Sequence, residues 1–191
     1  MKKLFLFIAL AFFAMTTMAQ TEHLTFKGIP IDGSLGDFIT KLKNTGLSYL
    51  GQDDGVAIFE GDFAGHRECN IAVATYQPTG KVSMVIVLFP AQDDWVTLET
   101  SYNSLKEMLS QKYDEPDTVI EEFQGYQPDT NNSKMHKLTM DQCTWGALFT
   151  TDNGEIELSI SKHNYLSGRI VLRYRDRINT DVVKQQAIND L

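Results

Sequence analysis

The chain has 191 residues, of which 17 are basic and 25 acidic, and its formal net charge is −8 at pH 7. An acidic chain without a basic run repels nucleic acid and anionic lipid surfaces, because both bind through clustered lysine and arginine. The composition therefore excludes nucleic acid as a partner, and the length allows one domain or two small domains packed together.

Residues 1–19 have the pattern of a secretory signal peptide. Two lysines are followed by an apolar segment, Leu4 to Phe13, and small residues surround a cleavage point after Ala19. A membrane-spanning helix needs about 20 apolar residues, and this segment is too short. The sequence predicts a periplasmic or secreted mature chain that has no membrane span.

The first predicted unit covers residues 20–92. An extended segment over residues 21–31 leads into a helix that Ser34 caps together with Asp37 and that ends at Gly46. The apolar face of this helix consists of Leu35, Phe38, Ile39 and Leu42. Glycines in the first of three strands indicate a bulge or a bend at a sheet edge, and the strands cover residues 56–64, 68–76 and 81–89.

The last of these strands contains an almost unbroken apolar run, Val82 to Phe89, that stops at a proline. A run of this length, bounded by turn residues and rich in β-branched side chains, indicates a strand buried on both faces. A hairpin closed at Tyr76 and Lys81 places Ile71 against Ile86 on one face. The other face then carries Ala72, Ala74, Val85, Val87 and Phe89.

If helices cover only one side of the sheet, one of these two faces is an exposed apolar surface, and such surfaces bind partners. We take the face that carries Ala72 and Val85 as the candidate interaction surface. The alternative is that a terminal segment, either the C-terminal helix or residues 26–31, folds over it.

The second predicted unit, residues 93–177, repeats the order of a helix followed by strands. Asp93 or Asp94 caps a helix that ends before a proline and whose apolar stripe is Trp95, Leu98, Tyr102, Leu105 and Leu109. A strand over residues 118–123 is followed by a polar stretch, residues 124–140, that we expect to be a long loop. The remaining strands cover residues 142–151, 155–162 and 169–175.

The first two of these remaining strands meet at Asn153-Gly154, a strong signal for a two-residue hairpin. A turn at this dipeptide places Phe149 opposite Leu158. The loop that follows places Leu158 opposite Leu172, so the three strands share one apolar face.

The same register places Glu157 opposite Arg173 on the other face. We therefore interpret the arginine row as a solvated surface of cross-strand ion pairs and not as an anion site, and the row consists of Arg169, Arg173 and Arg175. Residues 178–191 are predicted to form a C-terminal helix or tail with Asn179 as the cap.

Two units, each a helix followed by antiparallel strands, indicate an α+β fold with one extended antiparallel sheet and the helices on one face. Two adjacent sheets are the alternative. Each unit contains one cysteine, Cys69 and Cys143, and in an exported chain these can form a disulfide that joins the units. Two buried thiols are the alternative.

The order of elements resembles that of the β-lactamase inhibitor protein family. The opening run from Phe26 to Ser34, followed by Phe38, Leu42 and Gly46, is similar in rhythm to the start of such units. The resemblance implies a secreted fold of tandem helix-plus-four-strand units and the inhibition of an extracytoplasmic hydrolase. That family has a disulfide in each unit, which this chain cannot form, and no inhibitory residue maps onto this sequence.

Catalytic motifs are absent from the sequence, which has no serine-hydrolase elbow, zinc-protease pair, P-loop or dinucleotide-binding loop. The four histidines lack the spacing of zinc ligands. His66 and Cys69 are the only pair suggestive of a nucleophile, but three residues apart on a strand they face opposite sides. The acidic run over residues 114–122 lacks the pattern of a calcium loop.

We therefore expect no cofactor and no metal, and a non-enzymatic exported module that binds a protein or a component of the cell envelope. Three alternatives remain open. They are an inhibitor of an extracytoplasmic hydrolase, an enzyme of unrecognised type, and a structural subunit that forms a homodimer through its apolar face.

Overall fold

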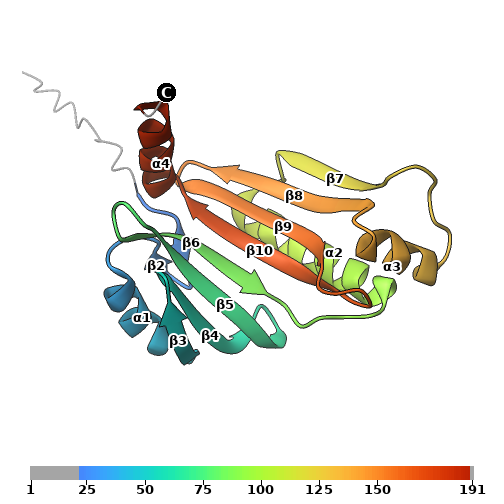
Figure 1. Ribbon diagram of the computed structural model, residues 1–191, viewed down its shortest axis with the longest axis horizontal. Coiled ribbons are helices and arrows are strands. Elements are labelled where there is room, and N and C mark those ends of the chain that lie inside the picture. The colour runs from blue at the N-terminus through green and yellow to red at the C-terminus, as the bar shows by residue number, and fades with distance from the viewer. Residues whose placement is uncertain (1–21, 190–191) are drawn as a thin grey trace, which may run out of the picture.

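The computed structural model describes residues 22–189, so the predicted signal peptide, residues 1–19, lies outside the described residues. Figure 1 shows an α+β fold in which helices pack against a large antiparallel sheet. The predicted fold class is thus confirmed. None of the helices in the described part has the length and apolar character that crossing a membrane requires.

The eight strands of the large sheet lie in the order β3-β4-β5-β6-β10-β9-β8-β7, and every neighbouring pair is antiparallel. The predicted single sheet is confirmed, because β6 pairs with β10 and joins the two halves of the chain. The strands are β3 (Ser48–Asp53), β4 (Val56–Phe63), β5 (His66–Tyr76), β6 (Lys81–Leu88), β7 (Thr118–Phe123), β8 (Cys143–Thr151), β9 (Gly154–Lys162) and β10 (Gly168–Asp176).

Two helices supply most of the helical contribution to the core. Helix α1 (Leu35–Lys43) begins after Ser34, whose hydroxyl accepts a hydrogen bond from the Asp37 backbone (3.2 Å). Helix α2 (Trp95–Tyr113) begins after Asp94, whose carboxylate accepts from the Thr97 backbone (2.7 Å). The buried stripe of α2 is the predicted one, namely Trp95, Leu98, Tyr102, Leu105 and Leu109.

The lead-in segment is a small hairpin of β1 (Thr25–Phe26) and β2 (Ile29–Pro30). Its anchor is Phe26, which stacks on Phe63 of β4 (ring centroids 5.3 Å apart) and meets Tyr174 of β10 edge-on (5.4 Å). The hairpin therefore packs on the same face of the sheet as the helices.

The prediction of a long loop over residues 124–140 is wrong, because Asn131–Thr139 form helix α3. The Thr130 hydroxyl caps it by accepting from the Ser133 backbone (3.2 Å), and the helix buries Met135 and Leu138. Only two large apolar side chains mark its inner face, too few to give a periodic signal. The last described element is helix α4 (Arg177–Asn189).

The predicted register of the β5–β6 hairpin is wrong beyond its first two pairs. Tyr76 pairs with Lys81 as predicted, but Ala74 pairs with Met84, which leaves Ser83 as an extra residue in β6. Such a bulge shifts the remaining pairs by one residue, and a shift of one residue exchanges the two faces of a strand.

The bulge divides the predicted interaction surface between the two sides of the sheet. Val85, Val87 and Phe89 are buried against the helices and cannot form a surface. Ala72 and Ala74 are half-buried on the opposite side, where their partners are Ile86 and Met84.

Two further register predictions have different outcomes. Leu158 pairs with Leu172 as predicted, whereas Phe149 pairs with Ile156 and not with Leu158, because the β8–β9 turn lies one residue earlier. Gly154 is part of β9, where an added Cβ would lie 2.1 Å from the Arg175 carbonyl oxygen. The shift of two residues leaves the faces as predicted.

The predicted bulge in β4 is also present, between Gly61 and Phe63. It lies beyond the last β3–β4 pair, Ser48–Glu60, so this stretch of β4 has no strand on its outer side among the described residues, as the predicted edge position requires.

The register set by the β6 bulge predicts that two similar substitutions differ in their effect on the free energy of unfolding. Ile71→Ala removes a fully buried side chain and should lower the free energy of unfolding by about 2–5 kcal/mol. Ile86→Ala, the same substitution on the opposite face of the neighbouring strand, should cost less than about half as much. Urea unfolding of both variants measures the difference, and an equal or larger loss for Ile86→Ala would contradict the register.

Candidate functional site

The face of the sheet opposite α1, α2 and α3 is the candidate site, and we call it the open face. Figure 1 looks onto it, with α2 and α3 behind the strands. Along β5, β6 and β9, buried residues that face the helices alternate with half-buried or exposed residues on the open face. Within residues 22–189 no helix lies over its centre, so these side chains are shielded mainly by their neighbours in the sheet.

The strand registers define continuous rows of side chains across the open face. One row begins with three aliphatic residues, continues with a charged pair and ends with a leucine and a threonine, and its members are Ile58, Ala72, Ile86, Arg173, Glu157, Leu148 and Thr118. The open face therefore changes character at β10, where the two halves of the chain meet.

The half of the open face over β4, β5 and β6 is apolar, and we call it the apolar half. Its half-buried members are Val56, Ile58, Ala72, Ala74, Met84, Ile86 and Leu88. Sequence reasoning found the two alanines but placed Met84 and Ile86 on the opposite face, because no local signal marks the bulge at Ser83.

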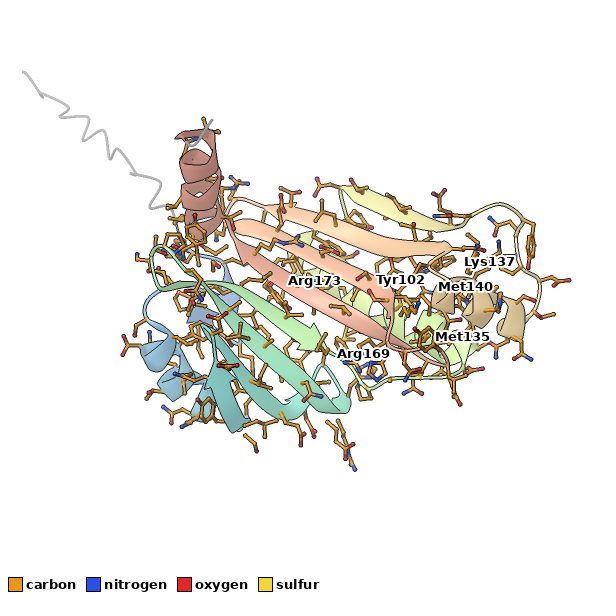
Figure 2. All side chains as sticks on the ribbon, in the orientation of Figure 1. Tyr102, Met135, Lys137, Met140, Arg169 and Arg173 are labelled. Carbon is orange, nitrogen blue, oxygen red and sulfur yellow. The ribbon has the colours of Figure 1, made fainter. Side chains whose placement is uncertain are left out.

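The polar half begins with an ion-pair ladder between β10 and β9. Both carboxylate oxygens of Glu157 are engaged, one by Arg173 Nη1 (2.9 Å) and the other by Arg175 Nη2 (2.8 Å). Glu155 lies 3.9 Å from Arg175. The predicted cross-strand pairs are present, and Figure 2 shows Arg173 on the near side of β10. Arg169, the third arginine of the row, contacts the His163 ring (3.0 Å to Nε2), and within residues 22–189 it forms no ion pair with an acid.

A groove of about 540 Å³ lies over the strands of the polar half. Gly146 of β8 lies between Ile120 of β7 and Ser159 of β9 in the sheet. Because glycine has no side chain, the space above it is part of the groove. The groove is bounded by the ion-pair ladder on one side and reaches β7, the edge strand, on the other.

The sequence pair His66 and Cys69 does not form a catalytic dyad. The Cys69 thiol contacts the backbone carbonyl of His66 (3.8 Å), while the His66 ring packs edge-on against Phe89 (5.0 Å between centroids). Among the described residues, no group of three or more His, Cys, Asp or Glu side chains could hold a metal ion.

Of the two alternatives for Cys69 and Cys143, the structure has free thiols and not the disulfide. They lie on β5 and β8, four strand spacings apart, a separation of about 19 Å where a bridge needs Cα atoms within about 7 Å. Burial raises the pKa of Cys69 to about 11, with a smaller contribution from the nearby Asp62 charge, and burial raises the pKa of Cys143 to about 12. Neither thiol is a nucleophile at neutral pH.

Thiol labelling tests whether both cysteines are free and unreactive in the native chain. In the native chain at pH 8, both cysteines should react with a thiol reagent at least about 100-fold more slowly than free cysteine, because a raised pKa leaves little thiolate. In urea without reductant, two thiols per chain should react. Fewer than two would show that a disulfide forms after all.

A second polar cluster lies where the first described residues meet the last helix. The buried carboxylate of Asp176, at the end of β10, accepts from the backbone N–H groups of Leu24 (2.8 Å) and Asn179 (3.0 Å). The ring of His23 lies 3.0 Å from Asp176 and 3.3 Å from Asp32. Sequence reasoning could not find this cluster, because its members are about 150 residues apart.

The predicted cap of α4, Asn179, is wrong. Asp176, and not Asn179, accepts from the first turn of the helix. The buried amide of Asn179 instead donates to the carbonyl oxygens of Ile31 (3.0 Å) and Val82 (2.9 Å). Since both ring nitrogens of His23 already have partners, we assign the cluster a structural role.

The charge of Asp32 contributes to the stability of this polar cluster. Burial acts to raise the pKa of Asp32, but the Gly33 N–H, the Asn179 amide, His23 and Lys81 together hold it below its ordinary value. A carboxyl with a lowered pKa stabilises the fold above its unfolded pKa, and this stabilisation is lost as the pH falls through the folded pKa.

Asp32→Asn should therefore lower the free energy of unfolding at pH 7, and the difference from wild type should close as the pH falls below 3.8, the ordinary pKa. Denaturant unfolding between pH 7 and pH 3 measures it. Asp53→Asn, at an exposed position of β3, is the control and should show no such trend. A difference that stays constant with pH would contradict the role of the Asp32 charge.

No protein-family model, no curated protein and no solved structure matches this chain. The resemblance to the β-lactamase inhibitor protein family therefore stays a prediction from the order of elements. The functional argument depends on the open face itself.

Proposed function

We propose that the mature chain is an exported, non-enzymatic binding module that holds a protein or cell-envelope partner on the open face. The observation that carries the proposal is the one-sided packing of the sheet. The elements that pack on it, α1, α2, α3 and the β1–β2 hairpin, contribute their buried residues to one core, while the aliphatic side chains of the apolar half remain partly in contact with water.

The composition of the open face suits a protein interface. Burying apolar surface yields about 25 cal/mol per Å², so a partner that covers the apolar half gains affinity from that half. Interfaces of this kind combine an apolar centre with a polar rim and are enriched in arginine. The ion-pair ladder of Arg173, Glu157 and Arg175 borders the apolar half and would fix the orientation of the partner.

The groups that line the groove support binding more than catalysis. Glu157 accepts from two guanidinium groups and is not free to act as a base, and burial keeps the Cys143 thiol protonated. None of the residues that line the groove in the described part is a histidine. The export part of the proposal depends on residues 1–19 of the sequence.

A paired charge test addresses this proposal. Ile86→Lys places a cation in the apolar half, and Val96→Lys places the same cation on α2, at a position that is 58% exposed. After capture from native envelope extract, the partner identified by mass spectrometry would be titrated with each purified variant. Ile86→Lys should weaken binding by at least about tenfold, and Val96→Lys should leave it unchanged.

Circular dichroism and thermal unfolding would establish that both variants fold. Equal partner affinity for the two variants would overturn the assignment of the open face. A wild-type dimer that Ile86→Lys dissociates would assign the face to a second copy of the chain, which is the homodimer alternative.

A further inference from the structure

We propose that β7 is a docking edge, and that an extended, basic segment of a partner chain pairs with it as a ninth strand of the sheet. The surface involved is the rim of the sheet and not the open face. The proposal is therefore independent of the function proposed above.

The two outer strands of the sheet differ in how well their edges are protected. In β3 the register is broken between Tyr49 and Gly51, so Leu50 is an extra residue and is 57% exposed. A bulge of this kind twists an edge away from further pairing. The register of β7 runs without a shift from Thr118 to Phe123, so its edge remains regular.

The regular edge presents unpaired backbone groups. Beyond the end of β7, the Gln124 N–H donates to the carbonyl of Gln142 (3.0 Å), and antiparallel ladders alternate between residues that bond to the neighbour and residues that do not. Counting back from Gln124, the N–H and C=O groups of Val119 and Glu121 point away from β8. Figure 1 shows no strand beyond β7 among the described residues.

The side chains of β7 would gain cover from an added strand. Val119 is 45% exposed and Ile120 is 44% exposed, and they point to opposite faces of the sheet. Ile120 also lines the groove, so an added strand would extend the groove wall at this side. Main-chain hydrogen bonds would supply affinity, and contacts with these two side chains would supply specificity.

The acidic residues in and before β7 indicate that the segment that docks on this edge is basic. Glu121 pairs with Lys106 of α2, and Asp117 accepts from the Thr150 backbone (2.6 Å). The other acidic residues of this segment have no ion-pair partner within residues 22–189, and they are Asp114, Glu115 and Glu122. Glu122 lies in β7, and Asp114 and Glu115 lie in the segment that leads into it, so these carboxylates attract lysine and arginine on an incoming strand.

The same charges disfavour a second copy of the chain as the occupant. Antiparallel pairing of two β7 strands would bring four glutamates into one short strand pair, and like charges across strands are destabilising. The occupant that fits is a segment in which small or β-branched residues alternate with basic ones.

The test uses a fluorescein-labelled synthetic peptide of about ten residues in which valine and threonine alternate with lysine. Fluorescence anisotropy measures its binding to the mature chain. Val119→Pro removes an outward N–H without removing a bond to β8, and should weaken binding by at least about tenfold. Val119→Ala keeps that N–H and should change the affinity by less than about threefold.

Hydrogen exchange keeps the test decisive if Val119→Pro fails to fold. In the wild-type chain, the peptide should slow exchange at the Val119 and Glu121 amides and leave the Gln52 amide of β3 unchanged. A peptide with glutamate in place of lysine should not bind, and binding of the basic peptide should weaken as salt is raised from about 50 to about 500 mM.

Equal affinity for the wild type and Val119→Pro, or no binding to the wild type, would overturn the proposal. The Ile86→Lys variant separates the two surfaces, since it should bind the peptide as the wild type does. Loss of the peptide in that variant, with unchanged exchange at β7, would place the peptide on the open face and overturn the docking edge while leaving the proposed function intact.

Discussion

The pairing of β6 with β10 is the interaction on which the rest of the structure depends. It joins the last strand of the first half of the chain to the last strand of the second half, through five residue pairs from Val171–Leu88 to Arg175–Met84. Without it the first half would be a four-stranded sheet whose most apolar strand, β6, was an edge, a template for aggregation. With it, β6 is interior, and the only edges of the large sheet are β3 and β7.

The same pairing creates the boundary within the open face. Apart from Asp176 at its end, the inward residues of β10 are apolar and meet the helices, whereas Arg173 and Arg175 on its outward side stand beside Ile86 and Met84 of β6. Because alternation along a strand assigns its residues to two environments, one segment of sequence can complete a core and also carry the ion-pair ladder. The apolar half and the polar half are adjacent for this reason.

Much of the fold could be predicted because its signals are local. The stripe of α2, the position of β6 in the sheet interior and the Leu158–Leu172 register all follow from periodicity and short loops. The bulge at Ser83 could not be predicted, since a hairpin with regular pairing satisfies the same apolar pattern, and it changed the membership of the candidate surface. Helix α3 gave too weak an apolar stripe, and the choice between a disulfide and free thiols stayed open because the sequence does not give the number of strands between the two cysteines. The contacts of Asp176 are between the two ends of the chain, where no window of sequence contains both partners.

The polar cluster at Asp176 also has a consequence for when the molecule can finish folding. Leu24 and His23 reach it across 152 and 153 residues of chain, and Asn179 reaches Ile31 across 148. These contacts cannot form until almost the entire polypeptide has been synthesised, and closing a loop of that length costs entropy before any contact repays it. For a chain proposed to leave the cytoplasm, such late closure prolongs the unfolded state in which it can be translocated.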